Sequence, residues 1–135
     1  KADSEVRLLG ATEAAPEDFL QADGYLFVAP ENLASLTGEM KALLDRAYYP
    51  LLGRIEGRPY ASMICAGSDG EGAARQLARI ATGWRLKAVA DPLVVRTGAQ
   101  TPEAILAPKT IPAEELARCR DLGMMMAAGL AMGIF

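Results

Sequence analysis

Two uninterrupted apolar segments constrain the fold of this chain more than any other feature. Residues 24–29 (Gly-Tyr-Leu-Phe-Val-Ala) end at Pro30, and residues 60–66 (Tyr-Ala-Ser-Met-Ile-Cys-Ala) end at Gly67. A strand that is apolar on both faces is typical of a parallel sheet covered by helices on its two sides. Each segment is followed by a polar loop and an amphipathic helix, so the sequence predicts an α/β fold.

The segments around these two strands complete the alternation of strands and helices. Apolar residues recur at helical spacing over residues 35–49, and Pro50 marks the predicted end of that helix. A second helix is predicted to end near Thr82, and a third strand covers residues 86–95, where Pro92 indicates an edge, a bulge or a strand start. The smaller predicted elements are a strand over 6–9, one or two helical turns over 15–20, a loop over 97–110 and a last helix from about 111. Residues 1–135 are therefore predicted to form a single three-layer domain with a mostly parallel, doubly wound sheet.

Composition limits the chemistry that this domain can perform. The 135 residues include 14 Lys and Arg against 17 Asp and Glu, a formal net charge of −3 that does not favour nucleic acid as a partner. The absence of histidine removes Ser-His and Cys-His nucleophile pairs and most zinc sites, so no catalytic side chain and no metal site is predicted. Two cysteines without metal-ligand spacing favour a reducing, cytoplasmic location. No uncharged run reaches the roughly 20 residues that span a bilayer, so no membrane association is predicted.

Ligands of parallel α/β sheets bind beyond the carboxyl ends of the strands, which directs attention to residues 30–37, 67–72 and 97–100. The glycines in Gly67-Ser68-Asp69-Gly70 allow close approach of a backbone to a ligand, and the next helix offers free N–H groups. The spacing matches neither a Walker A loop nor G-x-G-x-x-G. Because Asp69 and Glu71 would repel a polyphosphate, a neutral or ring-shaped ligand is favoured. The alternative is an ordinary turn between a strand and a helix.

The segment that begins at Pro30 has two interpretations. In the first, Glu31 and Asn32 project from the ligand-binding edge of the sheet, where they can hydrogen-bond a planar heterocycle. In the second, the segment is a plain connection between a strand and a helix, with Ser35 or Thr37 as the helix cap.

This segment also resembles a known family. Pro30-Glu31, Ser35 and Gly38, followed by Met-Lys-Ala-Leu-Leu-Asp-Arg over residues 40–46, are similar to the signature Pro-Glu-Tyr-Asn-Gly-Ser-x-x-Gly-x-x-Lys-Asn-x-x-Asp. That signature is typical of NAD(P)H-dependent FMN reductases, which belong to the flavodoxin-like group together with the NAD(P)H:quinone oxidoreductases. Residues 22–27 are similar to the strand that precedes the signature. The resemblance covers the chain from residue 6 to the final helix and implies a flavodoxin-like fold.

In the family, two loops hold the flavin ring of FMN. Carried over by position, the resemblance implies eight cofactor-binding residues: Pro30, Glu31, Asn32 and Leu33 in the first loop, and Gly67, Ser68, Asp69 and Gly70 in the second. The chain departs from the family at Asn32, where an aromatic residue is frequent, and at Leu33-Ala34, which replaces Asn-Gly.

The resemblance implies an FMN-dependent oxidoreductase that passes reducing equivalents from NAD(P)H through the flavin to a quinone or a similar small-molecule acceptor. Two alternatives stay open. The first is a flavodoxin-type electron carrier, although carriers tend to be more acidic than a net charge of −3. The second is a cofactor-free interaction or regulatory domain on the same fold.

The two ends of the sequence lead to further expectations. The family's central first strand and its Ser/Thr-rich phosphate loop have no counterpart here, since residues 6–9 resemble the second strand. The chain also begins with Lys, and we therefore expect it to be the N-terminally incomplete part of a longer natural chain. Near the other end, Met124, Met125 and Met126 are expected to pack on the sheet or on a second subunit, which predicts a homodimer or homotetramer.

Overall fold

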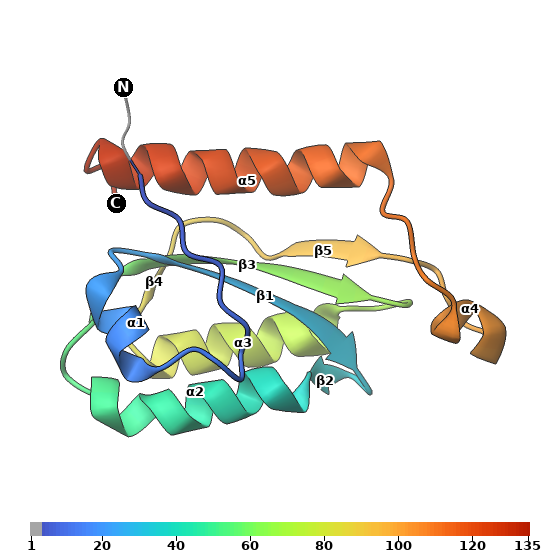
Figure 1. Ribbon diagram of the computed structural model, residues 1–135, viewed down its shortest axis with the longest axis horizontal. Coiled ribbons are helices and arrows are strands. Elements are labelled where there is room, and N and C mark those ends of the chain that lie inside the picture. The colour runs from blue at the N-terminus through green and yellow to red at the C-terminus, as the bar shows by residue number, and fades with distance from the viewer. Residues whose placement is uncertain (1–3) are drawn as a thin grey trace.

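The computed structural model describes residues 4–135 and contains one sheet between two layers of helices (Figure 1). The strands are β1 (Tyr25–Asn32), β2 (Ser35–Leu36), β3 (Pro59–Ala66), β4 (Lys87–Ala88) and β5 (Leu93–Arg96). The helices are α1 (Pro16–Gln21), α2 (Gly38–Leu51), α3 (Glu71–Gly83), α4 (Pro102–Leu106) and α5 (Ala113–Ala131). The predicted three-layer α/β fold is confirmed.

Strand β3 is the centre of the sheet. It runs parallel to β1 along one side, from the Tyr25–Tyr60 pair to the Pro30–Cys65 pair. Its other side pairs in parallel with β4 near its start and with β5 near its end. Pro92 lies in the break between β4 and β5, as expected for a residue that cannot donate to a strand ladder. The exception to the parallel order is β2, which pairs antiparallel with the last two residues of β1.

The main core lies between the sheet and helices α1, α2 and α3. An aromatic cluster forms its centre: Phe19 of α1 lies with its ring centroid 5.2 Å from Tyr25 and 5.4 Å from Trp84, and Phe27 lies 6.1 Å from Tyr60. All five side chains are buried. Burial of one such side chain stabilises the fold by about 1.5–3 kcal/mol, so this cluster fixes α1 and α3 on the same face of the sheet.

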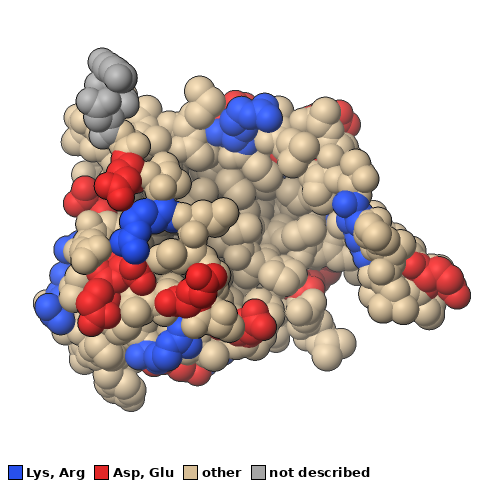
Figure 2. Space-filling view, in the orientation of Figure 1, with Lys and Arg blue, Asp and Glu red and all other residues tan. Residues whose placement is uncertain are grey.

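The opposite face of the sheet is covered unevenly. Helix α5 packs on β3 and β5 and buries its own Met126 there, whereas Met124 and Met125 are exposed, contrary to the expectation that all three pack on the sheet. The outward face of β1 remains open. Leu26 is 38% exposed and Val28 is 56% exposed. Below α5, Figure 2 shows a hollowed surface without charged side chains at its centre. The prediction that residues 24–29 are buried on both faces is therefore wrong for β1, while β3 is buried on both faces over most of its length.

Residues 6–9 do not form the predicted strand. Val6 and Leu8 are exposed, and the segment pairs with no strand in residues 4–135. Without a neighbouring strand, an extended segment gains no ladder hydrogen bonds. Side-chain contacts hold the segment in place instead, since Arg7 forms an ion pair with Asp18 at 2.6 Å.

Three predicted boundaries are wrong for local reasons. Pro30 lies inside β1, which continues to Asn32, because the last residues of β1 pair with β2. Ser35 is in β2, and the helix predicted over 35–49 begins at Gly38. The loop predicted over 97–110 contains the short helix α4, whose N-terminus is capped by the Thr101 side chain. No helix in the described part of the chain has the length and hydropathy to cross a membrane.

Candidate functional site

The carboxyl ends of β1, β3 and β5 meet at one edge of the sheet because these strands are parallel. Backbone hydrogen bonds join the segments that leave β3 and β5. The Thr97 N–H donates to the carbonyl oxygen of Ala66 at 2.8 Å, and the Gly98 N–H donates to the carbonyl oxygen of Gly67 at 2.7 Å. The two loops implied by the family resemblance and the third candidate loop, residues 97–100, therefore lie side by side.

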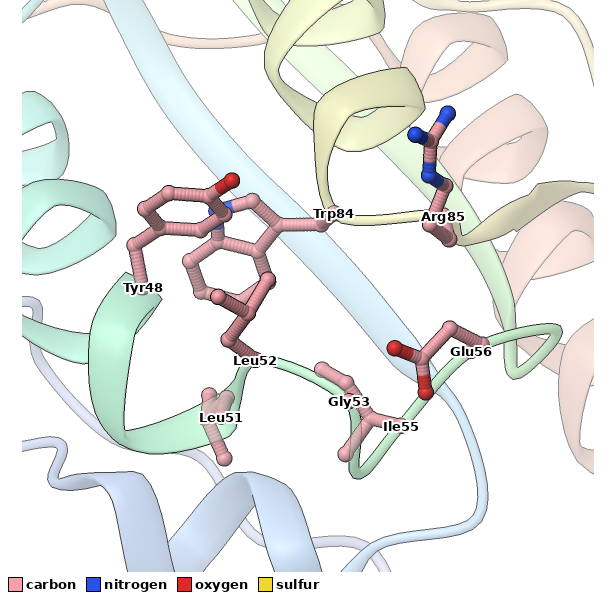
Figure 3. Close-up of a pocket in the computed structure, with 8 residues that line it drawn as sticks. All are labelled: Tyr48, Leu51, Leu52, Gly53, Ile55, Glu56, Trp84 and Arg85. Atoms are coloured by element: carbon pink, nitrogen blue, oxygen red, sulfur yellow. The ribbon is translucent and has the colours of Figure 1, made fainter.

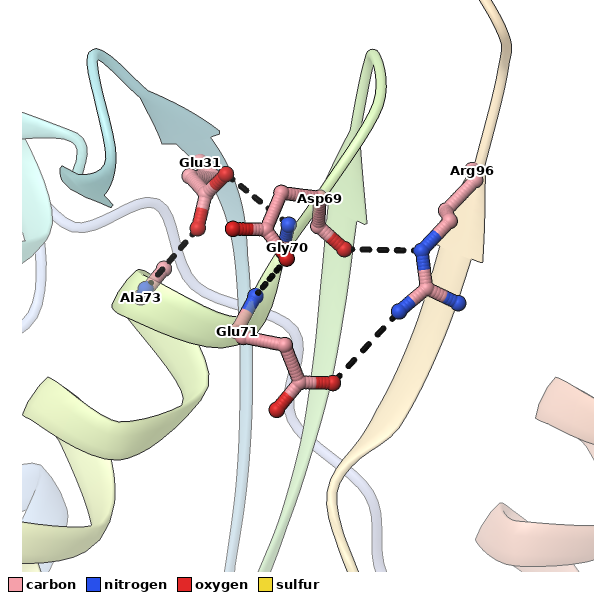
Figure 4. Close-up of polar contacts among 6 residues, drawn as sticks. All are labelled: Glu31, Asp69, Gly70, Glu71, Ala73 and Arg96. Atoms are coloured by element: carbon pink, nitrogen blue, oxygen red, sulfur yellow. Dashed lines mark hydrogen bonds and ion pairs between the residues drawn. The ribbon is translucent and has the colours of Figure 1, made fainter.

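The glutamate at the end of β1 connects the first predicted loop to the second. One carboxylate oxygen of Glu31 accepts a hydrogen bond from the Gly70 N–H at 2.8 Å, and the other accepts one from the Ala73 N–H at 3.0 Å (Figure 4). Gly70 and Ala73 belong to the start of α3, where unpaired N–H groups favour an acceptor with negative charge. Glu31 therefore caps α3 from a neighbouring strand and fixes the end of the glycine-containing loop.

A tight hairpin turn connects β1 to β2. Its two central residues, Leu33 and Ala34, have φ values of 53° and 65°. Two positive φ values are typical of a type I′ turn, for which Asn-Gly is the preferred pair. Leu33 and Ala34 thus adopt a backbone that Asn-Gly favours, and as residues with a Cβ they adopt it at a cost. Leu33 is 100% exposed at the tip.

The loop from Gly67 to Gly70 depends on its two glycines. Gly70 has a φ of 90°, and a Cβ there would overlap the side chain of Val94 on β5. A Cβ at Gly67 would lie 2.9 Å from the carbonyl oxygen of Ala99, inside normal contact distance. The loop therefore passes close to both β5 and the segment that follows it, which no larger residue permits without movement.

The middle of this loop provides unused hydrogen-bond donors. Within residues 4–135, the backbone N–H groups of Ser68 and Asp69 have no hydrogen-bond acceptor, and both residues are exposed. The Asp69 carboxylate accepts a hydrogen bond from the Glu71 N–H at 3.3 Å, so the negative charge of Asp69 lies at the start of α3. Neutral donors between glycines can hydrogen-bond the carbonyl and nitrogen acceptors of a planar ring.

The structure brings together some of the eight predicted site residues and separates others. Glu31 contacts Gly70 directly, and Gly67, Ser68 and Asp69 continue that loop. Pro30 is paired within the sheet, opposite Cys65, while Asn32 and Leu33 are exposed near the hairpin turn. Of the two residues predicted to cap the helix, Ser35 does not and Thr37 does so by position only. Ser35 is a strand residue, and Thr37 occupies the N-cap position without a side-chain capping bond.

Three residues that support this edge were not among the eight predicted site residues. Arg96, the last residue of β5, donates through Nε to the carbonyl of Asp69 at 2.8 Å. Gln76 of α3 accepts from the Leu36 N–H of β2 at 2.7 Å, and Gly72 lies against the backbone of the hairpin turn. Arg96 could have been found, since it is a lone charge at the carboxyl end of an apolar strand. Gly72 lies at the end of the candidate loop over residues 67–72, whereas Gln76 gives no such signal.

The surface pocket drawn in Figure 3 lies elsewhere, beside the carboxyl-terminal ends of α2 and α3. Eight residues line it: Tyr48, Leu51, Leu52, Gly53, Ile55, Glu56, Trp84 and Arg85. It contains none of the predicted site residues. Tyr48 stacks on Trp84 with a centroid separation of 6.4 Å, so its ring is part of the aromatic packing beside this pocket.

The perturbed pKa values also lie away from the strand ends. Burial raises the pKa values of Tyr25 and Tyr60 above the ordinary tyrosine range. A hydrogen bond from the Ala15 backbone lowers the pKa of Asp18. Arg58 lies in the same region, where its guanidinium donates hydrogen bonds to backbone carbonyls at the end of α1 and to the Tyr25 hydroxyl. These groups stabilise α1 and do not form part of the candidate site.

A parallel sheet with helices on both faces and paired loops at the carboxyl ends of its strands defines a doubly wound α/β protein, the class that includes the flavodoxin-like fold. The sequence model of the NADPH-dependent FMN reductases matches residues 3–100, and the chain belongs to this family. A flavodoxin from Aquifex aeolicus (strain VF5) is 30% identical over 134 residues, which are 96% of this chain and 72% of that protein. The function of the present chain is therefore flavin-related redox chemistry, as an oxidoreductase or as an electron carrier.

A solved structure supports the same fold. A flavodoxin from the domain Archaea superposes with a TM-score of 0.66 at 12% identity, over 87% of this chain and 72% of its own. An NADPH-quinone reductase from P. pentosaceus aligns with a TM-score of 0.49 at 17% identity, over 66% of this chain and 64% of its own. The flavodoxin-like fold expected from the sequence is thus confirmed by the archaeal flavodoxin.

Proposed function

We propose that this protein is an FMN-dependent oxidoreductase that passes reducing equivalents from NAD(P)H to a quinone or a similar small acceptor. The observation that carries the proposal is the linked pair of loops at the carboxyl ends of β1 and β3, joined through Glu31 and Gly70. Membership of the NADPH-dependent FMN reductase family supports both the cofactor and the electron donor.

The residues at this edge fit the flavin ring of FMN. Ser68 and Asp69 offer two neutral backbone donors, and the hydrogen bonds of Glu31 already hold the neighbouring backbone. These loops carry two acidic residues, Asp69 and Glu31, and no basic residue, so the donor set suits a neutral ring better than a phosphate. The ring is therefore the part of the cofactor that we assign to residues 30–33 and 67–70.

Each part of the edge has a distinct role in this proposal. Bound FMN supplies the redox chemistry, since no side chain of the protein needs to accept a hydride. Ser68 and Asp69 orient the ring through backbone donors, and Gly67 and Gly70 keep the loop close to β5. Glu31 fixes the loop, while Leu33 at the tip of the hairpin provides apolar surface beside it.

An electron carrier is the second candidate. The curated relative with 30% identity is named a flavodoxin, and that observation favours a carrier without a nicotinamide reaction. The net charge of −3 favours the reductase, because electron carriers tend to be more acidic.

The decisive experiment begins with FMN binding by the protein expressed from its natural gene. We expect visible flavin absorbance after purification and release of FMN on denaturation. A colourless protein that does not bind FMN in a fluorescence titration would contradict both flavin proposals and favour the cofactor-free domain.

Turnover then separates the two flavin proposals. Rapid oxidation of NADH or NADPH with a quinone supports the reductase, and slow or absent turnover with both nucleotides supports the carrier. The preferred nucleotide follows from the same measurement. Cytoplasmic location and a homodimer or homotetramer stay predictions, for fractionation and light scattering to test.

A further inference from the structure

One peptide group in the glycine-containing loop is held at both of its ends. The carbonyl of Asp69 accepts a hydrogen bond from Arg96 Nε at 2.8 Å, and the N–H of the same peptide unit, on Gly70, donates to Glu31 Oε1 at 2.8 Å. Because a peptide group is planar, these two bonds together fix its orientation. Figure 4 shows the two side chains approaching the loop from opposite sides, Glu31 from β1 and Arg96 from β5.

Charge makes both bonds stronger than ordinary backbone hydrogen bonds. A guanidinium donor at one end and a carboxylate acceptor at the other polarise the peptide group in the same sense. The Gly70 φ of 90° lies in the left-handed region, which glycine adopts readily, so the backbone permits this peptide orientation and the two hydrogen bonds select it.

A second contact of Arg96 orients its side chain. Nη2 lies 3.4 Å from Glu71 Oε1 at the start of α3, and both side chains are about half exposed. An ion pair of this length and exposure contributes little energy by itself. The bond to the Asp69 carbonyl is therefore the contact that matters for the loop.

We propose that Arg96 is a positioning residue, which holds the Asp69–Gly70 peptide so that the Ser68 and Asp69 N–H groups are presented to the flavin ring. This inference rests on the proposed FMN site. A loop fixed before binding avoids the ordering cost that a mobile loop incurs when its ligand binds. Arg96 does not need to touch the cofactor, because it acts through the backbone of the loop.

The test compares Arg96→Gln with Arg96→Lys and with the matched control Arg75→Gln. Arg75 lies exposed on α3, and its side chain has no hydrogen-bond partner within residues 4–135. Three quantities are measured: the amide exchange rate of Gly70 by NMR without FMN, the Kd for FMN, and the visible absorption spectrum of bound FMN at saturation. The spectrum reports on the surroundings of the ring, which a general loss of stability does not change.

For Arg96→Gln we expect faster Gly70 exchange, roughly tenfold weaker FMN binding, as loss of one charge-assisted hydrogen bond gives, and a shifted flavin spectrum. Arg96→Lys restores part of the affinity, since the ammonium keeps the charge but loses the planar donor fork. Arg75→Gln leaves all three quantities unchanged.

Two results would overturn the inference. The first is unchanged Gly70 exchange in both Arg96 variants, and the second is faster exchange with unchanged FMN affinity and spectrum. If Arg96→Gln does not fold, Arg96→Lys is judged by the same criteria. A wild-type protein that binds no FMN contradicts the proposed function, and the Gly70 exchange rate then decides separately whether Arg96 holds the loop.

Discussion

The hairpin turn at Leu33 and Ala34 makes a quantitative prediction about stability. Both residues have positive φ, where a non-glycine side chain costs on the order of 1 kcal/mol. Replacing the pair by Asn-Gly, the preferred type I′ sequence, relieves about 2 kcal/mol of strain in the folded state. The extra freedom of glycine in the unfolded chain offsets about 0.5–1 kcal/mol of this gain.

The double variant Leu33→Asn/Ala34→Gly should therefore be more stable by about 1–1.5 kcal/mol. No buried contact is lost, because Leu33 is fully exposed. For a domain of this size, the gain corresponds to a rise in Tm of roughly 3–6 °C. Urea unfolding, followed by the circular dichroism signal of the helices, gives the free energy of unfolding of both proteins.

The control variant Ala34→Val works in the opposite direction, since a β-branched side chain is disfavoured at positive φ. We expect it to lower the free energy of unfolding, and the Asn-Gly variant to raise it. Equal stability of the wild type and the Asn-Gly variant would refute the strain argument. It would mean that the turn adopts its backbone at no measurable cost.

Four further predictions concern other parts of the fold. Arg58→Ala should destabilise the protein by about 2–4 kcal/mol in urea unfolding, because its guanidinium donates to three backbone carbonyls at the end of α1; a loss below about 0.5 kcal/mol would contradict this role. Burial raises the pKa of Tyr25, so the unfolded chain loses its phenol proton first and stability should fall as the pH rises above about 10; Tyr25→Phe should weaken that dependence. Backbone hydrogen bonding lowers the pKa of Asp18, so stability should fall as the pH drops below about 4, and Asp18→Asn should reduce that slope. Gly72→Ala should cost about 1–3 kcal/mol and weaken FMN binding, because the added Cβ overlaps the Ala34 carbonyl; unchanged unfolding and binding would show that the turn yields freely.

Periodicity predicted the parts of the fold that depend on burial. The apolar runs before Pro30 and Gly67 became β1 and β3, and the helical spacing after each became α2 and α3. The Pro92 break was also predicted, because a missing N–H is a local property. These features depend on which side chains need to leave water, and the sequence contains that information directly.

Pairing partners could not be predicted in the same way. Ser35 continued the helical spacing but became part of β2, because two residues in a tight turn place it opposite Asn32. The family signature located Glu31, yet its bonds to Gly70 and Ala73 join positions 39 and 42 residues apart. Such contacts depend on the arrangement of strands, which a local pattern does not specify.

The open face of β1 has a consequence for the site. A strand that is open on one face has fewer buried contacts than a strand covered on both faces, so we expect β1 to open locally and to exchange its amide hydrogens before β3 does. Glu31 lies at the end of β1, so each local opening of this strand would also release the start of α3. A ligand that bridges the two loops would consequently protect β1 as well, and its affinity would be linked to the stability of a strand beside the binding edge.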